Sequence, residues 1–215
     1  MPMTGLSAFR PRVAMLAPTA TDPMIDQAVL DACIDFCERT LVVKRMLTPF
    51  PTVADTAVYA PAAPADESVA HIMRVWCDVT ELDPLDEEGI GSPFGFVTTV
   101  AGQTNTPGRP RYFNETDPGS ISLFPRPDAV YTINARVALR PLRSATTVDS
   151  QLFEDWVEGI TSGALARLYA VPGDLLNAPL AKYHAENYMA SVHRALLQAP
   201  KGRVRSQGRV TPIHI

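Results

Sequence analysis

Residues Thr21–Thr40 read TDPMIDQAVLDACIDFCERT, and this stretch decides the fold. Its apolar side chains recur at helical spacing and form one stripe, which consists of Ile25, Val29, Ala32, Cys33, Phe36 and Cys37. Polar side chains occupy the opposite side, at Gln27, Asp31, Asp35 and Glu38. Asp22 is suited to accept from the free N–H groups at a helix start, and Pro23 suits the first helical turn. The stretch therefore predicts an amphipathic helix from about Pro23 to Arg39, with an apolar side that needs a packing partner.

A second helix is predicted from Asp149 to about Ala170, where Val171-Pro172-Gly173 ends it. Its apolar residues repeat every four positions, at Leu152, Trp156, Ile160, Ala164 and Leu168. Gly159 and Gly163 add small surfaces where another helix can approach closely.

A third helix is predicted to begin at Pro179, with Asn177 or Ala178 at its cap, and to end at Pro200 and Gly202. Its expected stripe consists of Ala181, Ala185, Tyr188, Met189, Val192, Ala195 and Leu196. Since each of the three helices has an apolar side to bury, both ends of the chain are expected to join in one helical bundle.

The middle of the chain has a different pattern, because prolines interrupt residues 42–145 too often for long helices. Short β-favouring runs lie between them, at His71–Val79, Phe94–Val100, Arg111–Glu115, Ser120–Phe124 and Val130–Leu139. The turn residues Thr116-Asp117-Pro118-Gly119 separate two of these runs and predict a hairpin. Polar and apolar residues alternate along Val130–Leu139, which predicts a half-buried antiparallel strand.

The predicted fold is therefore α+β. Residues 1–41 and 146–200 are expected to form the helical bundle, and residues 42–145 an inserted antiparallel β module. Residues 201–215 have no helical period and are expected to form an extended C-terminal tail.

Composition and charge exclude several classes of protein. The 215 residues are 46% hydrophobic and 20% charged, and no run approaches the roughly 18 to 20 apolar residues of a membrane span. The first residues lack the apolar core of a signal peptide, so none is expected. The net charge of −4 argues against a dedicated nucleic-acid binder. Residues 198–215 carry four basic residues and no acidic one, which leaves 15 basic against 23 acidic residues, or −8, on the rest.

The three cysteines, Cys33, Cys37 and Cys77, are expected to be reduced thiols in the core. Cys33 and Cys37 share a helix face, too close along the axis for a comfortable disulfide. With His71 they make a possible set of four zinc ligands, but their spacing is not that of a zinc knuckle. Packing is the favoured interpretation and a metal site the alternative.

No catalytic set emerges from the other polar residues. The acidic stretch Asp78–Glu88 lacks a calcium-loop pattern and is expected to be a solvated surface. Gly89–Gly95 lacks the spacing of a phosphate loop, and Gly159–Gly163 has its serine one place late for a nucleophile elbow. His184 and His193 are nine positions apart and are expected at the surface or at an interface. No catalytic residue, cofactor or metal is predicted, and the protein is expected not to be an enzyme.

Three segments resemble the head–tail connector adaptor proteins of bacteriophages. They are the helix TDPMIDQAVLDACIDFCERT, the sequence EGITSGALARL at Glu158–Leu168 followed by Val171-Pro172-Gly173, and the helix AKYHAENYMASVHRAL at Ala181–Leu196. The resemblance covers both helical parts, whereas the proline-rich middle matches in layout only. It implies a ring, usually a dodecamer of identical copies, in the virion neck at the portal vertex, assembled in the host cytoplasm.

The same resemblance implies the partners of each part. The helical bundle is expected to dock on the portal protein, the β part to face a downstream tail or neck protein, and an extended C-terminal segment to insert between portal subunits. DNA is expected to pass through the ring without sequence-specific binding, and no membrane or cofactor is implied. The acidic residues of the body would repel phosphates in such a passage.

The C-terminal residues support a binding role on physical grounds as well. Apolar residues there alternate with arginines, which suits a segment that pairs in extended form with another chain. The predicted portal-binding tail consists of Arg203, Val204, Arg205, Arg209, Val210, Ile213 and Ile215. A frayed terminus without a role is the alternative for this segment.

Other functions remain open on the sequence alone. A different neck or tail ring, such as a stopper or a tail terminator, is the nearest alternative, although helices at both ends of the chain favour the adaptor. A small metal-dependent hydrolase and a bacterial binding module of unknown partner are the alternatives from other classes.

Overall fold

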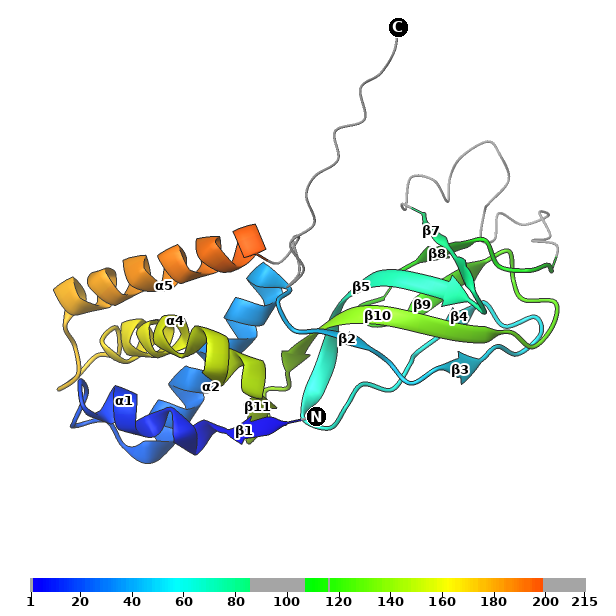
Figure 1. Cartoon of the computed structure of the whole chain (residues 1–215). Helices are drawn as coiled ribbons and strands as arrows, with labels where there is room; N and C mark the ends of the chain where they lie inside the picture. Colours follow the sequence, from blue (N-terminus) through cyan, green and yellow to red (C-terminus); the bar gives the residue numbers. More distant parts are fainter. Residues whose placement is uncertain (1, 86–106, 116, 199–215) are drawn as a thin grey trace, which may run out of the picture.

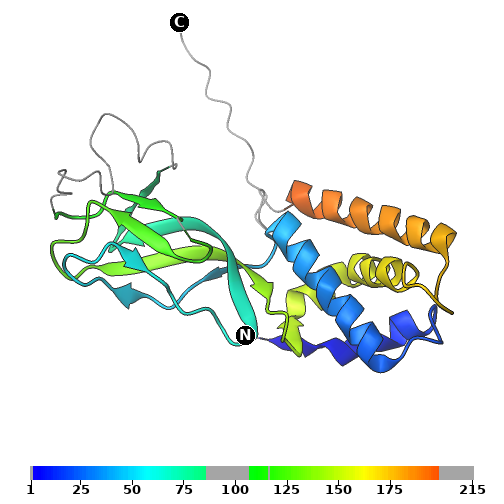
Figure 2. The same ribbon diagram turned by 180° about the vertical axis from the view of Figure 1, so that it is seen from behind.

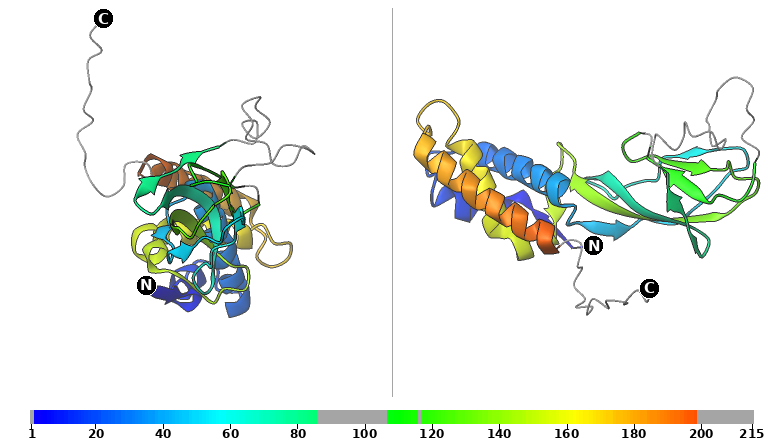
Figure 3. Two further views of the ribbon diagram at one scale, coloured as in Figure 1. Left: turned by 90° about the vertical axis from the view of Figure 1, so that its right-hand side faces the viewer. Right: turned by 90° about the horizontal axis from the view of Figure 1, so that it is seen from above.

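The helices and the two larger sheets lie at opposite ends of the computed structural model, which describes residues 2–85, 107–115 and 117–198 (Figure 1). Figure 2 shows the same division from behind, and Figure 3 shows it end-on and from above. Residues 3–5, near the start of the chain, lie between the two ends, where the helices meet the long strands. The α+β prediction is confirmed.

Three long helices, α2 (Asp22–Thr40), α4 (Ser150–Leu168) and α5 (Ala178–Gln198), pack together as the sequence predicts. Asp149 caps α4, because its Oδ1 accepts from the backbone N–H of Gln151 at 2.8 Å. Asn177 caps α5 in the same way, accepting from the N–H of Leu180 at 3.2 Å. Asn177 is one of the two cap residues that the sequence predicts for α5, whereas Asp149, the predicted first residue of α4, is its cap.

The start of α2 differs from the prediction, because Asp22 does not cap it. Thr21 occupies the N-cap position, and no side chain there accepts a capping hydrogen bond. The carboxylate of Asp22 instead accepts from Arg10 at 2.7 Å, and Arg10 also bonds to Asp26. Arg10 begins the short helix α1 (Arg10–Ala14), which follows the 3-10 turn η1 (Leu6–Ala8); the sequence predicted neither.

The helix α2 is buried on more sides than a single stripe implies. All six predicted stripe residues are buried, and Ala28, Leu30 and Ile34 are buried as well. The helices α4 and α5 cover one side of α2, while α1, η1 and strand β10 (Thr132–Pro141) contact it elsewhere. α2 is therefore the central helix of the bundle.

The helix α5 lies on the outside of the bundle and buries a narrower strip than predicted. Tyr188, Val192 and Ala195 are buried, but Ala185 and Leu196 are exposed, which corrects the predicted stripe. A peripheral helix with neighbours on one side only has no second surface to cover such residues.

The predicted close approach at the two glycines of α4 is confirmed. A Cβ atom built on Gly159 would lie 2.6 Å from the Ser191 Cβ, and one on Gly163 would lie 2.7 Å from the Tyr188 ring. Both distances are too short for a real contact, so only glycine lets α5 pack this close to α4.

The larger sheet is built on two long antiparallel strands, β5 (Glu67–Cys77) and β10. Its order is β2-β10-β5-β6, with β2 (Lys44–Met46) and β6 (Thr80–Glu81) at the edges, and β3 (Phe50–Pro51) also pairs with β10. The alternation predicted along β10 holds from Thr132 to Val137, and a register shift follows Arg136. β5 ends before the predicted Val79, because Asp78 adopts a left-handed conformation with φ of 56°.

The smaller sheet has the order β4-β9-β8-β7, formed by β4 (Val58–Tyr59), β9 (Ile121–Phe124), β8 (Tyr112–Asn114) and β7 (Asp83–Pro84). The predicted hairpin is confirmed, since β8 and β9 pair antiparallel across the turn. β7 pairs with β8 in parallel, which the predicted antiparallel module did not include. The predicted run Phe94–Val100 lies outside the described residues.

A single carboxylate ties the hairpin to the larger sheet. Glu115, which follows β8, accepts from the N–H of Ile72 at 3.0 Å and from the N–H of Gly119 at 2.9 Å. His71 also lies 3.1 Å from it. One hydrophobic core cluster includes buried residues of both sheets and of the helices.

A third, two-stranded sheet connects the N-terminal segment to the start of α4. β1 (Met3–Gly5) pairs antiparallel with β11 (Thr147–Asp149), and the sequence predicted neither strand. None of the helices in the described part of the chain is long and apolar enough to cross a membrane.

Candidate interaction surfaces

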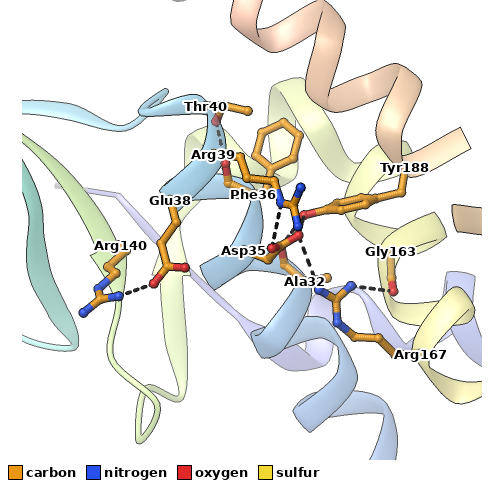
Figure 4. Close-up of polar contacts among 10 residues, drawn as sticks. All are labelled: Ala32, Asp35, Phe36, Glu38, Arg39, Thr40, Arg140, Gly163, Arg167 and Tyr188. Atoms are coloured by element: carbon orange, nitrogen blue, oxygen red, sulfur yellow. Dashed lines mark hydrogen bonds and ion pairs between the residues drawn. The ribbon is translucent and has the colours of Figure 1, made fainter. Parts of the chain in front are cut away.

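The three helices of the bundle meet at the carboxylate of Asp35 on α2 (Figure 4). Tyr188 of α5 donates to it at 2.6 Å, and Arg39 of α2 donates to it at 2.8 Å. Arg167 of α4 places a guanidinium nitrogen 3.5 Å away and also donates to the carbonyl of Gly163 at 2.8 Å. One half-buried charge thus fixes α4 and α5 on the central helix.

The pKa values of this cluster follow from burial and hydrogen bonding. Burial raises the pKa of the Asp35 carboxyl, but hydrogen bonds from Tyr188 and Arg39 outweigh it and leave the pKa below its ordinary value. Burial raises the pKa of Tyr188, and the hydrogen bond to Asp35 raises it further. At neutral pH the pair is an ionised carboxylate and a neutral phenol, which is an arrangement for holding helices rather than for transferring protons.

Two ion pairs connect the helices to the strands. Glu38 of α2 pairs with Arg140 of β10, as Figure 4 shows, and Asp149 at the α4 cap pairs with Arg45 of β2. The second pair is the more buried, since Asp149 is only 3% exposed. These contacts set how the sheets are held against the bundle.

A strip of α4 faces outward between α5 and the residues that follow α1. We call the strip from Glu154 to Leu165, with the side chains that border it, the α4 trough. It contains two hollows. The apolar hollow, of about 290 Å³, is lined by Arg12, Met15, Leu16, Glu158, Thr161, Ser162, Leu165 and His184. The acidic hollow, of about 470 Å³, is lined by Glu154, Asp155, Trp156, Arg194 and Gln198.

The two hollows follow one another along the helix. Glu154 of the acidic hollow and Glu158 of the apolar hollow are one helical turn apart and share a face of α4. Both are exposed, and neither forms an ion pair with any residue that the structure describes. The trough therefore carries three carboxylates, at Glu154, Asp155 and Glu158, against the two guanidinium groups of Arg12 and Arg194.

The wall of the apolar hollow is held in place by Tyr169, which follows α4. Its hydroxyl donates to the carbonyl of Leu16 at 2.6 Å, and its ring stacks on His184 with centroids 5.8 Å apart. Burial lowers the pKa of His184. Hydrogen bonding and ring stacking of Tyr169 thus fix the side chains that form the wall of the apolar hollow.

Three polar atoms that line the trough are buried and have no hydrogen-bond partner among the described residues. They are the Oγ1 of Thr161 and the Nδ1 of His184 in the apolar hollow, and the Nε1 of Trp156 in the acidic hollow. Thr161 is 8% exposed and Trp156 is 4% exposed. Buried polar atoms are nearly always paired, but these three have almost no exposed surface, so a partner can bond to them only after neighbouring side chains move.

Large apolar side chains are exposed at both ends of the molecule. At the helical end they include Met15, which is 78% exposed, and Tyr183, which is 58% exposed. At the sheet end Val79 is 93% exposed, and Val53 and Val130 are exposed as well. Single exposed apolar side chains are common on protein surfaces, and these are available for contact with other proteins.

The predicted site residues fall into separate places. The seven predicted portal-binding residues, Arg203, Val204, Arg205, Arg209, Val210, Ile213 and Ile215, lie outside the described residues. Of the acidic stretch, residues 78–85 are described, and Asp78 and Glu81 pair with Arg109 and Arg74.

The predicted thiols and histidines are also accounted for. Cys33, Cys37 and Cys77 are buried and free, which confirms their place in the core. His71 is exposed beside Glu115, and the described residues contain no group of three or more side chains placed to hold a metal. His193 is exposed and His184 borders the apolar hollow, as expected for surface or interface histidines.

Neither the Asp35 cluster nor the trough is evident from the sequence. The helical pattern places Asp35 on the polar side of its helix, where no buried partner is expected. Its partner Tyr188 belongs to the predicted apolar stripe of another helix, so the sequence does not indicate that the two meet. Glu154, Asp155 and Glu158 lie off the apolar repeat of α4, and their crowding on one side was the only available signal.

Residues 3–212 match the family model described as SU10 adaptor protein. No curated protein matches the chain at a significant level.

Proposed function

The chain belongs to the SU10 adaptor protein family, whose members are phage head–tail adaptors, and from this membership we propose that it forms a ring joining the portal to the tail. Its role is that of a structural phage adaptor. In the proposed ring, identical copies surround a passage for DNA at the neck of the virion. The observation that carries the proposal is a family match that extends over nearly the whole chain.

The two-ended architecture supports a connecting role. We assign the helical end to the portal protein and the sheet end to a downstream tail or neck protein. Exposed Met15 and Tyr183 at one end and Val79 at the other supply apolar contact surface for two different partners. Residues 1–41 with 146–200 and residues 42–145 are the corresponding units, and the packing of α2 against α4 and α5 supports this division.

The C-terminal residues are assigned to the portal. Arg203, Arg205 and Arg209 offer positive charge, and Val210 and Ile213 offer β-branched side chains that suit extended pairing. The net charge of −4 supports a passage that does not bind DNA, because negative charge repels the phosphates.

The experiment is a measurement of mass with and without the portal. The purified chain, the purified portal ring of the same phage and their mixture are compared by native mass spectrometry and electron microscopy. We expect a monomer that becomes a ring only on the portal. A chain that does not bind the portal, or that forms the same ring without it, would contradict the proposal.

A truncated chain tests the tail assignment. Deletion after Lys201 is expected to leave the circular dichroism spectrum unchanged and to abolish co-sedimentation with the portal. Unchanged co-sedimentation would refute a portal-binding tail while leaving the ring proposal in place.

A further inference from the structure

The α4 trough begins where the C-terminal segment leaves the bundle. Gln198, the last residue of α5, itself lines the acidic hollow together with Glu154 and Asp155. The segment of residues 199–215 is therefore attached directly at one end of the trough. Attachment keeps its effective concentration at this surface high.

The segment is long enough to follow the trough to its far end. Gln198 and His184 are 14 positions apart on α5, which corresponds to about 21 Å of helix. Residues 199–215 number 17, and an extended chain of that length spans up to about 55 Å. The segment reaches the apolar hollow with residues to spare.

The charges of segment and trough are opposite. The segment carries Lys201 and three arginines and no acidic residue. The trough presents Glu154 and Glu158 without ion-pair partners among the described residues, and Asp155 stands beside them. Arg12 and Arg194 also border the hollows and oppose a basic segment, although Arg194 lies over the Trp156 ring at 5.2 Å.

The unpaired polar atoms could bond to an extended main chain once the side chains above them move. The indole N–H of Trp156 donates, so it suits a main-chain carbonyl at the acidic end after Arg194 moves off its ring. The hydroxyl of Thr161 and the imidazole of His184 suit main-chain groups further along. Apolar walls at Met15, Leu16 and Leu165 suit side chains such as Val210 or Ile213.

We propose that in the free chain residues 199–215 lie along the α4 trough of the same molecule. The contact is intramolecular and does not require the portal. If the proposed function holds, the portal releases the segment from the trough, so the acidic strip becomes exposed only in the assembled ring.

The experiment uses the free full-length chain and paramagnetic relaxation. Val210→Cys introduces an accessible thiol for a nitroxide label, since the three native cysteines are buried. Amide NMR signals are recorded with the label oxidised and reduced. We expect at least a twofold loss of intensity for Glu158 and its neighbours on α4, and unchanged intensity for residues of β8 and β9.

Charge variants show whether the acidic strip is responsible. The double variant Glu154→Gln/Glu158→Gln is expected to restore most of the lost intensity, as is 0.5 M NaCl, a concentration that screens exposed charges at distances above about 4 Å. The matched control Glu81→Gln/Asp83→Asn removes two exposed carboxylates at the sheet end and is expected to restore none.

A mixed sample separates the two possible origins of broadening. Labelled chain without ¹⁵N is mixed with ¹⁵N chain without label, and no broadening is expected. Broadening in the mixture would assign the trough to the tail of a second copy and overturn the intramolecular contact. The absence of broadening in every sample would also overturn it, and portal binding, measured separately, would be unaffected by either result.

Discussion

The phenol of Tyr188 donates a 2.6 Å hydrogen bond to the carboxylate of Asp35, across 153 positions of sequence. The same hydroxyl lies 3.3 Å from the carbonyl of Ala32. The Tyr188 ring packs against Gly163, at a place where the Cβ of any other residue would clash with it. The packing of α2, α4 and α5 against one another thus depends on the side chain of Tyr188.

Removal of this hydroxyl is expected to loosen α5. Tyr188→Phe deletes a hydrogen bond to a charged group and should lower the free energy of unfolding by about 1.5–3 kcal/mol. Urea denaturation followed by circular dichroism measures the change. Tyr183→Phe is the matched control, because Tyr183 is exposed and should change stability by less than about 0.5 kcal/mol. Equal effects of the two variants would contradict the role given to Tyr188.

The Asp35 carboxylate is expected to make stability depend on pH. Its pKa in the folded chain is below the ordinary value of 3.8, so the folded state favours the ionised form. Its contribution is therefore complete above about pH 4 and is lost as the pH falls through the folded-state pKa. Asp35→Asn should destabilise the chain at pH 7, and the difference from the wild type should shrink below pH 4. A difference that stays constant down to pH 2.5 would show that the charge of Asp35 is irrelevant.

The glycine of α4 nearest Ser191 is expected to resist replacement. Alanine normally favours helices by about 1 kcal/mol over glycine. Here Gly159→Ala would put its Cβ 2.6 Å from the Ser191 Cβ, so a net loss of about 1–3 kcal/mol is expected instead. Thermal unfolding provides the measurement.

A second substitution tests the cause of that loss. Ser191→Gly removes the clashing atoms, so the variant Gly159→Ala/Ser191→Gly should be more stable than the sum of the two single effects predicts. Simple additivity would mean that steric conflict with Ser191 is not the reason.

The buried cap of α4 is expected to matter more than an ordinary cap. Asp149 accepts from the Gln151 N–H and also pairs with Arg45 of β2. Asp149→Ala removes both interactions and should cost about 2–4 kcal/mol. Asp149→Asn keeps an oxygen for the cap and should cost less. If the two variants were equally unstable in urea, the cap would contribute nothing beyond the charge.

The three thiols are expected to be unreactive in the folded chain. Burial raises the pKa of Cys33, Cys37 and Cys77, and the thiolate is the form that reacts. At pH 8 iodoacetamide should modify none of them while the chain is folded and all three in 8 M urea, as intact mass would show. Rapid modification of one thiol without urea would place that cysteine outside the core.

The long elements of the fold were predictable because their patterns are local. The stripe of α2, the four-residue repeat of α4 and the turn after β8 each specify structure within one stretch of sequence. The elements that were missed, such as β1 and α1, have three and five residues and no periodicity of their own. β1 forms because β11 lies beside it, and Arg10 at the start of α1 is held by Asp26 of α2. Both neighbours are distant in sequence, so only the fold brings them together.

The candidate surfaces were predictable only in part. The basic tail stands out by composition, and its role stays a prediction. Ala185 and Leu196 fit the stripe of α5 but are exposed, because a helix at the outside of a bundle buries less than its periodicity allows. The trough depends on where the residues after α1 lie relative to α4, and no pattern within either segment reveals that.

The pairing of β5 with β10 carries the sheets away from the helices, and α2 meets that sheet chiefly along β10. We therefore expect a substitution in the β8–β9 hairpin to leave the packing of α2 against α4 and α5 unchanged. If the proposed adaptor role holds, the sheet end can vary with a downstream partner while the helical end keeps its own contacts.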